Sequence, residues 1–210
     1  MEKLPALADA VAASHLEPSS RLGLATFAVL SHYLGDDWIA KWVLRDERGQ
    51  QGFVRWASAE EAAFTTSAMR TLAEGLINFQ RVGGFWSVVE TLHDKGPEIG
   101  HSEFSSAFLL ARLNIPFRFH APTGIKGDSF DLDIRLDGLD VCGETKCKLD
   151  GSAPSPDSLL RSVEKARAKN LPKDRPGVIF AHVPRSWISG PKDLAELAEA
   201  VSTRLSSSGR

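Results

Sequence analysis

Hydrophobic residues in the first 95 positions recur mostly at helical spacing. Four segments share this spacing and predict helices: 4–15, 20–33, 58–80 and 84–94. Ser58 stands three residues before Glu61, a capping-box pattern that favours a helix start. Residues 38–44 and 52–56 flank a polar, glycine-containing segment and predict a hairpin. We therefore expect residues 1–95 to form a mostly helical region.

After Lys95-Gly96-Pro97, a combined helix stop signal, the pattern changes. Apolar spacing and turn residues predict, in order, a helix at 102–113, a strand at 117–120, a hairpin of 129–136 with 139–148, a helix at 157–170, a strand at 177–183 and a helix at 191–205. This order predicts that residues 96–210 form an α/β domain with a central mixed β-sheet flanked by helices.

The predicted hairpin has a defined register. Asp137-Gly138 is a favoured type I′ turn pair, and a two-residue loop there fixes which residues face each other. Asp131 then lies directly opposite Glu144, and Asp133 lies opposite Cys142. Because side chains alternate between the faces of a strand, both carboxylates of the first pair share one face.

Two carboxylates in facing positions repel each other. A divalent cation between them removes the repulsion, and Mg²⁺ favours carboxylate and water oxygens. Lys146 lies on the same face, where an ammonium can orient a water or offset charge on a phosphate. A hairpin with one solvated outer face has the same alternation, so this simpler interpretation stays open.

Further candidate metal ligands lie nearby. Glu103 shares one side of the predicted helix with Ala107 and Leu110, although an acid in the first turn also stabilises the helix dipole. Asp133 is on the same hairpin face as Asp131 and is a second-rank ligand, as is the backbone of Cys142.

Basic residues gather after the hairpin. Residues 155–185 contain seven arginines and lysines but three acids. Arg161, Lys165 and Lys169 recur every four positions, a stripe that suits nucleic-acid phosphates and equally an ordinary solvated helix face. Lys126, in the loop before the hairpin, is a further candidate contact.

The order of a helix with an acid, a strand, an Asp strand, a tight turn, a Glu-x-Lys strand, a helix and a strand resembles the PD-(D/E)xK, or restriction-endonuclease-like, nuclease superfamily. The resemblance covers residues 101–185 and rests on Phe130-Asp131-Leu132-Asp133 and Cys142-Gly143-Glu144-Thr145-Lys146. Gly143 and Thr145 stand where aliphatic residues are usual, and Phe130 stands where a proline is usual.

This resemblance implies an enzyme that uses Mg²⁺ or Mn²⁺ to hydrolyse phosphodiester bonds. DNA is the favoured substrate, and RNA is the second choice. Glu103, Asp131 and Glu144 would hold the metal, and Lys146 would position and activate the attacking water. Asn170 is the nearest counterpart to a glutamine that some relatives carry near the end of the following helix. Many such enzymes form homodimers. A disabled module of the same fold that binds nucleic acid or a protein is the alternative, and a structural subunit with a solvated acidic face is another.

Composition indicates the class of protein and the cellular compartment. With 42% hydrophobic and 25% charged residues the chain is typical of a globular protein, and a net charge of −2 gives no global sign of nucleic-acid binding. We expect no membrane span and no signal peptide. Cys142 and Cys147 should face opposite ways on one strand, which argues against a disulfide and favours the reducing cytoplasm.

Overall fold

The computed structural model describes residues 9–13, 15–44, 53–121, 123, 125, 129–148 and 153–208. The chain forms two compact units, Met1–Phe108 and Leu109–Arg210. The boundary between them falls inside a helix, whereas the sequence suggested one after residue 95.

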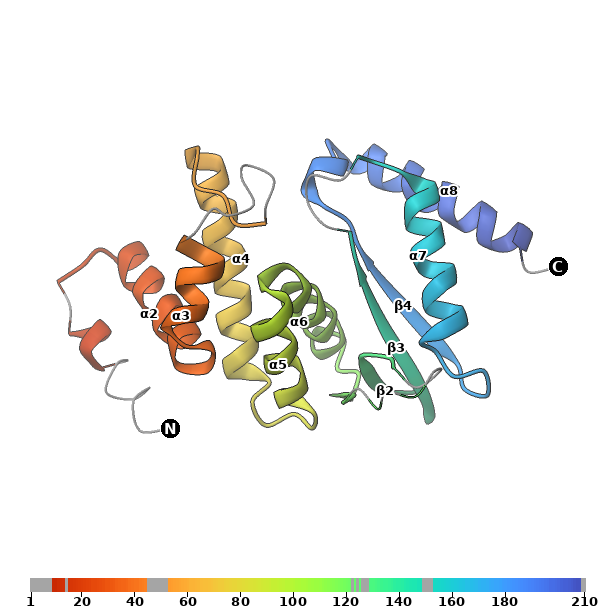
Figure 1. Ribbon diagram of the computed structural model, residues 1–210, viewed down its shortest axis with the longest axis horizontal. Coiled ribbons are helices and arrows are strands. Elements are labelled where there is room, and N and C mark those ends of the chain that lie inside the picture. Colours follow the sequence, from red (N-terminus) through yellow and green to blue (C-terminus); the bar gives the residue numbers. More distant parts are fainter. Residues whose placement is uncertain are drawn as a thin grey trace. The chain divides into compact units, whose positions relative to one another are not determined.

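The described part of the first unit is helical (Figure 1). Its elements are α2 (Pro18–Leu34), α3 (Asp36–Ile39), the π-helix η1 (Ala40–Leu44), α4 (Ala59–Asn78), α5 (Phe85–Lys95) and the larger part of α6 (Pro97–Arg112). Leu30, Leu72 and Leu92 are fully buried in its core. The predicted helical character of this region is confirmed over these residues.

The hairpin predicted at 38–44 and 52–56 is wrong where the structure describes it. Residues 38–44 are helical, and 53–56 form no strand. Trp38 is 2% exposed and its indole N–H donates to the carbonyl oxygen of Leu92 at 3.0 Å. Packing of Trp38 and the buried Val43 against neighbouring helices therefore outweighs the local strand propensity.

Helix ends in this unit follow the sequence signals in part. The Ser58 hydroxyl accepts a hydrogen bond from the Glu61 N–H at 3.2 Å, which confirms the predicted start of α4. Gly96 ends α5 with a φ of 91°, a value that favours glycine. Helix α6 then begins at Pro97, five residues before the predicted start at Ser102. Proline is well tolerated in the first turn of a helix, so it can start α6 directly after Gly96.

The second unit is built on a four-stranded sheet in the order β1-β2-β3-β4. Its elements are β1 (Phe117–Phe119), β2 (Leu132–Leu136), β3 (Leu139–Cys147), α7 (Pro156–Lys169), β4 (Gly177–His182), the short 3₁₀ helix η3 (Arg185–Trp187) and α8 (Pro191–Ser208). The first three strands pair antiparallel and β4 pairs parallel with β3, so the predicted α/β class with a mixed sheet is confirmed. No helix in the described ranges is long and apolar enough to cross a membrane.

One helix packs on this sheet, and a second helix packs on the first. α7 lies along β3 and β4, and α8 packs on α7 (Figure 1). Lys148, at the end of β3, donates from Nζ to both Ser158 and Ser162 on α7, so α7 lies over the face from which Lys148 projects. Glu144 and Lys146 project from that same face by the two-residue period of a strand.

The hairpin register is confirmed from Leu136↔Leu139 to Leu132↔Gly143. Asp137 and Gly138 have φ values of 49° and 82°, as a type I′ turn requires. The ladder ends at Leu132, so β2 is shorter than the predicted strand from Ser129. The Asp131 N–H donates to the carbonyl oxygen of Gly143, one residue out of this register. Asp131 and Glu144 are therefore not a regular facing pair.

Candidate active site

Glu144 lies in the middle of the covered sheet face and is 1% exposed. Its neighbour two residues along β3, Lys146, forms an ion pair with Glu144 Oε1. The side chain of Lys146 is 27% exposed, so the ammonium lies between the buried carboxylate and solvent. The simpler interpretation of a solvated outer face is therefore wrong for Glu144.

Asn170 supplies a second donor to one oxygen of this carboxylate. It caps the C-terminal end of α7 and donates from Nδ2 to Glu144 Oε1 at 2.7 Å. At the other end of α7 the Ser155 hydroxyl accepts from the Ser158 N–H, which fixes the start of the helix. Two donors from two elements thus hold Oε1 of one buried carboxylate and offset part of the cost of removing its charge from water.

Asp131 lies beside this group on the adjoining strand segment. It is half-buried, and its Oδ2 accepts a hydrogen bond from the Thr145 N–H at 2.6 Å. Since Thr145 stands between Glu144 and Lys146, the Asp131 carboxylate is attached to the part of β3 that carries both candidate residues. The bulge at Asp131 therefore replaces the predicted facing pair with a side-chain contact to the β3 backbone.

Glu103 belongs to the first unit. It is 9% exposed on α6, and Ala107 and Leu110 on the same helix are buried too, as the predicted spacing indicated. Its relation to Asp131 and Glu144 stays a prediction.

The carboxylates near β3 could bind a divalent metal through at most two protein ligands. Within the described ranges, no three His, Cys, Asp or Glu side chains gather as a ligand group. Mg²⁺ nevertheless binds in many proteins through one or two carboxylates and keeps several waters. Asp131 and Glu144 supply that number, whereas the predicted part of the Cys142 backbone stays untested.

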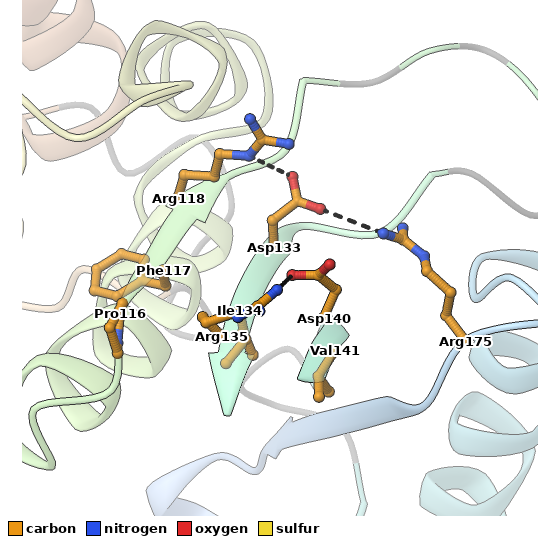
Figure 2. A pocket seen from close by; sticks show the side chains of 9 residues that line it. All are labelled: Pro116, Phe117, Arg118, Asp133, Ile134, Arg135, Asp140, Val141 and Arg175. Carbon is orange, nitrogen blue, oxygen red and sulfur yellow. Dashed lines mark hydrogen bonds and ion pairs between the residues drawn. The ribbon is translucent and has the colours of Figure 1, made fainter. Parts of the chain in front are cut away.

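Asp133, the second-rank candidate ligand, is surrounded by cationic side chains (Figure 2). Its Oδ2 accepts from Arg118 Nε at 3.0 Å and lies 3.1 Å from His120 Nδ1. Arg175 lies 4.0 Å from its other oxygen. These partners disfavour a divalent cation at Asp133, because positive charge already occupies its surroundings.

A pocket of about 320 Å³ opens next to Asp133 (Figure 2). It is lined by Pro116, Phe117, Arg118, Asp133, Ile134, Arg135, Asp140, Val141 and Arg175. Two facing pairs of the sheet form ion pairs in it, Arg118 with Asp133 and Arg135 with Asp140, the latter at 2.6 Å. With three arginines and two aspartates, the lining is net positive.

The predicted basic stripe is placed on α7, where Arg161, Lys165 and Lys169 are all exposed. Lys126 lies outside the described residues.

The sequence interpretation missed Lys148. Its Nζ donates to the Ser158 carbonyl and to the hydroxyls of Ser158 and Ser162 at 2.7, 2.8 and 2.7 Å. Burial, and secondly the charge of Arg161, lower the pKa of Lys148 below its ordinary value. The two-residue alternation of Glu144, Lys146 and Lys148 was the signal that could have found it.

Arg118 and Arg175 were also missed. The pairing of β1 with β2 depends on the long connection between them, which has no tight turn to fix the register. Arg175 was counted only among the basic residues of 155–185, and no local pattern links it to Asp133.

Comparison of the chain with protein-family models, with curated proteins and with solved structures finds no match.

Proposed function

We propose that this protein is a divalent-metal-dependent nuclease with a restriction-endonuclease-like core, acting on DNA in preference to RNA. The observation that supports this most is the buried Glu144 carboxylate, held by Lys146 and Asn170 under α7. A buried charged group replaced by apolar residues is often neutral or stabilising for a fold. An apolar side chain could fill the position of Glu144 in this sheet. The buried carboxylate there therefore favours a chemical role.

In this proposal Asp131 and Glu144, both in the second unit, hold Mg²⁺ or Mn²⁺. The bound metal supplies positive charge that stabilises the phosphorane-like transition state and lowers the pKa of water.

The chain's own residues supply the rest. Lys146 places an ammonium at the solvent side of Glu144, where it offsets charge on the attacked phosphate and orients the incoming water. Asn170 keeps the Glu144 carboxylate in one orientation through its 2.7 Å hydrogen bond. A fixed orientation matters because the reacting groups must already be aligned when the substrate binds.

The DNA backbone would be held by the exposed basic residues. Arg161, Lys165 and Lys169 on α7 are separated by about one helical turn each, so their cations line one side of the helix. Lys126 is a further contact in the proposal, and a homodimer would place two such sites on two strands.

A second candidate function is binding without hydrolysis, to nucleic acid or to a protein partner. It is favoured by the ion pair and hydrogen bond that already balance Glu144, and by the lack of a three-ligand group in the described ranges. The first proposal differs in requiring both a metal and Lys146.

The deciding experiment is cleavage of plasmid DNA, linear DNA, single-stranded DNA and RNA with Mg²⁺ or Mn²⁺. Lys146→Ala should lower the rate about 100-fold, the order seen when one charge-stabilising donor is removed. Lys192→Ala is the matched control, because Lys192 is 87% exposed on α8 and pairs with Glu196. It should leave the rate unchanged.

Metal binding is tested separately by calorimetry with Mn²⁺ on the wild type and Glu144→Gln. The glutamine keeps the size of the side chain and an oxygen acceptor for Asn170, so the fold is retained while the charge is lost. Heat of binding that persists in this variant contradicts the assigned ligand. DNA binding by a wild type that cleaves none of the substrates favours the second candidate.

A further inference from the structure

The pocket beside Asp133 holds three arginines that the proposed hydrolysis does not use. We infer that this pocket binds a phosphate group, with Arg118 and Arg175 as the contacting residues. It would hold part of the ligand away from the group around Glu144.

Arg118 presents its guanidinium outward. It lies directly opposite Asp133 in the sheet, and the contact with that carboxylate uses Nε at 3.0 Å. The side chain is 69% exposed, and its two terminal nitrogens extend beyond the carboxylate (Figure 2). Those terminal N–H groups form the planar fork that matches two oxygens of a phosphate.

Arg175 approaches the same carboxylate from the other side (Figure 2). Its guanidinium lies 4.0 Å from Asp133 Oδ1 and 5.3 Å from the centre of the Phe130 ring. The ring itself is stacked on His120, with centroids 3.9 Å apart. These contacts restrict the long side chain before a ligand binds, which reduces the entropy lost on binding.

The charge balance favours an anion. Arg118 and Arg175 share one carboxylate, Asp133, whereas Arg135 has its own partner in Asp140. Two guanidinium groups around one carboxylate leave a positive charge for a ligand to complement.

The geometry favours phosphate over a carboxylate ligand. The two cations come from different elements, β1 and the segment before β4, and therefore point from different directions. A phosphate offers oxygens in several directions and accepts from both forks, whereas a planar carboxylate matches one fork.

This inference rests on the proposed function only for the source of the phosphate, which we assign to the DNA substrate. Inorganic phosphate or a nucleoside monophosphate would use the same contacts, and the experiment separates these sources.

The experiment measures binding of the full chain in EDTA, so that cleavage does not occur. A short fluorescein-labelled DNA duplex is titrated by anisotropy at several salt concentrations, and inorganic phosphate is titrated by NMR of the arginine Nε–H signals. Arg118→Ala should weaken DNA binding about tenfold and lower the slope of log K against log salt by about one. Arg118→Lys, which keeps the charge without the fork, should recover only part of the affinity.

Arg70→Ala is the matched control. Arg70 is 52% exposed on α4 and pairs with Glu74 at 2.7 Å, so its removal changes the net charge equally at a residue that does not line the pocket. It should change the affinity less than about twofold, because salt screens an exposed charge that does not contact the ligand.

Each outcome bears on the inference. Equal effects of Arg118→Ala and Arg70→Ala on DNA and on phosphate binding would overturn it, even where Lys146-dependent cleavage supports the proposed function. Complete recovery in Arg118→Lys would overturn the two-oxygen contact. Phosphate binding that Arg118→Ala abolishes, in a protein that binds no DNA, supports the pocket and counts against the nuclease proposal. No binding of either ligand by the wild type overturns the pocket.

Discussion

Replacing Asn170 by alanine should lower the local stability of the second unit around Glu144. The substitution removes the Nδ2 donor that lies 2.7 Å from Glu144 Oε1, and this carboxylate is 1% exposed. Water does not replace the lost donor easily at such a buried atom. A hydrogen bond to a charged group contributes about 1.5–3 kcal/mol, so we expect a loss of that order in local stability.

The loss is measurable as amide hydrogen exchange of β3 and β4, followed by mass spectrometry. Where exchange follows the opening equilibrium, 1.4 kcal/mol corresponds to a factor of about ten. Asn170→Ala should therefore speed exchange of these strands about tenfold to hundredfold. Asn170→Asp should speed it further, because a second carboxylate would repel Glu144.

Asn78→Ala is the matched control. Asn78 is exposed at the last position of α4, so it shares the residue type and the helix end but not a buried partner. It should leave β3 and β4 exchange unchanged. Equal protection of these strands in Asn170→Ala and Asn78→Ala would refute the assigned role of the Asn170–Glu144 hydrogen bond.

Three further changes test other parts of the second unit. Gly143→Ala places a Cβ 2.8 Å from the Ile134 side chain, so it should lower the free energy of unfolding in urea by about 1–3 kcal/mol; an unchanged midpoint would contradict the close packing. Burial lowers the pKa of His182 below its ordinary value of 6.5. On acidification the unfolded chain then takes up a proton before the folded one does, so stability should fall below about pH 6.5. His182→Gln should flatten that dependence in pH-resolved melting, and an identical slope would exclude His182 as its source. Lys148→Met removes three hydrogen bonds, including one to Ser162, and should speed amide exchange in the first turns of α7 about tenfold; unchanged exchange there would show that this lysine does not anchor the helix.

Local patterns predicted the elements whose signals are themselves local. Asp137-Gly138 fixes a two-residue turn, and the register from Leu136↔Leu139 onward follows from it. Ser58 with Glu61 likewise marks the start of α4. These features depend on backbone geometry within a few residues, so the sequence contains the information needed.

The departures arise where distant contacts decide. Residues 38–44 have strand-like composition but form helices because Trp38 is buried and bonded to Leu92. At Asp131 the ladder breaks because the carboxylate takes the Thr145 N–H and the amide bonds to Gly143. No local pattern predicts a bulge of this kind.

In the candidate site, too, local sequence patterns predict some residues, and the others depend on tertiary packing. Glu144 and Lys146 could be placed on one face from the strand period, and Asn170 could be named only through the family resemblance. Its contact with Glu144 depends on how α7 packs on the sheet, which periodicity does not specify. The cations around Asp133 come from two separate segments, so their meeting depends on the tertiary fold.

The continuous helix α6 has a practical consequence for dissecting this protein. The boundary between the two compact units lies between Phe108 and Leu109, within the span Pro97–Arg112. A fragment cut at that boundary would keep only the last turn of the helix, too short to remain helical in water. A start at Pro97 would keep the helix whole but would separate the fully buried Phe104 from Phe79 and Gly75, on which it packs. The two units share this helix and are therefore best produced as a single chain.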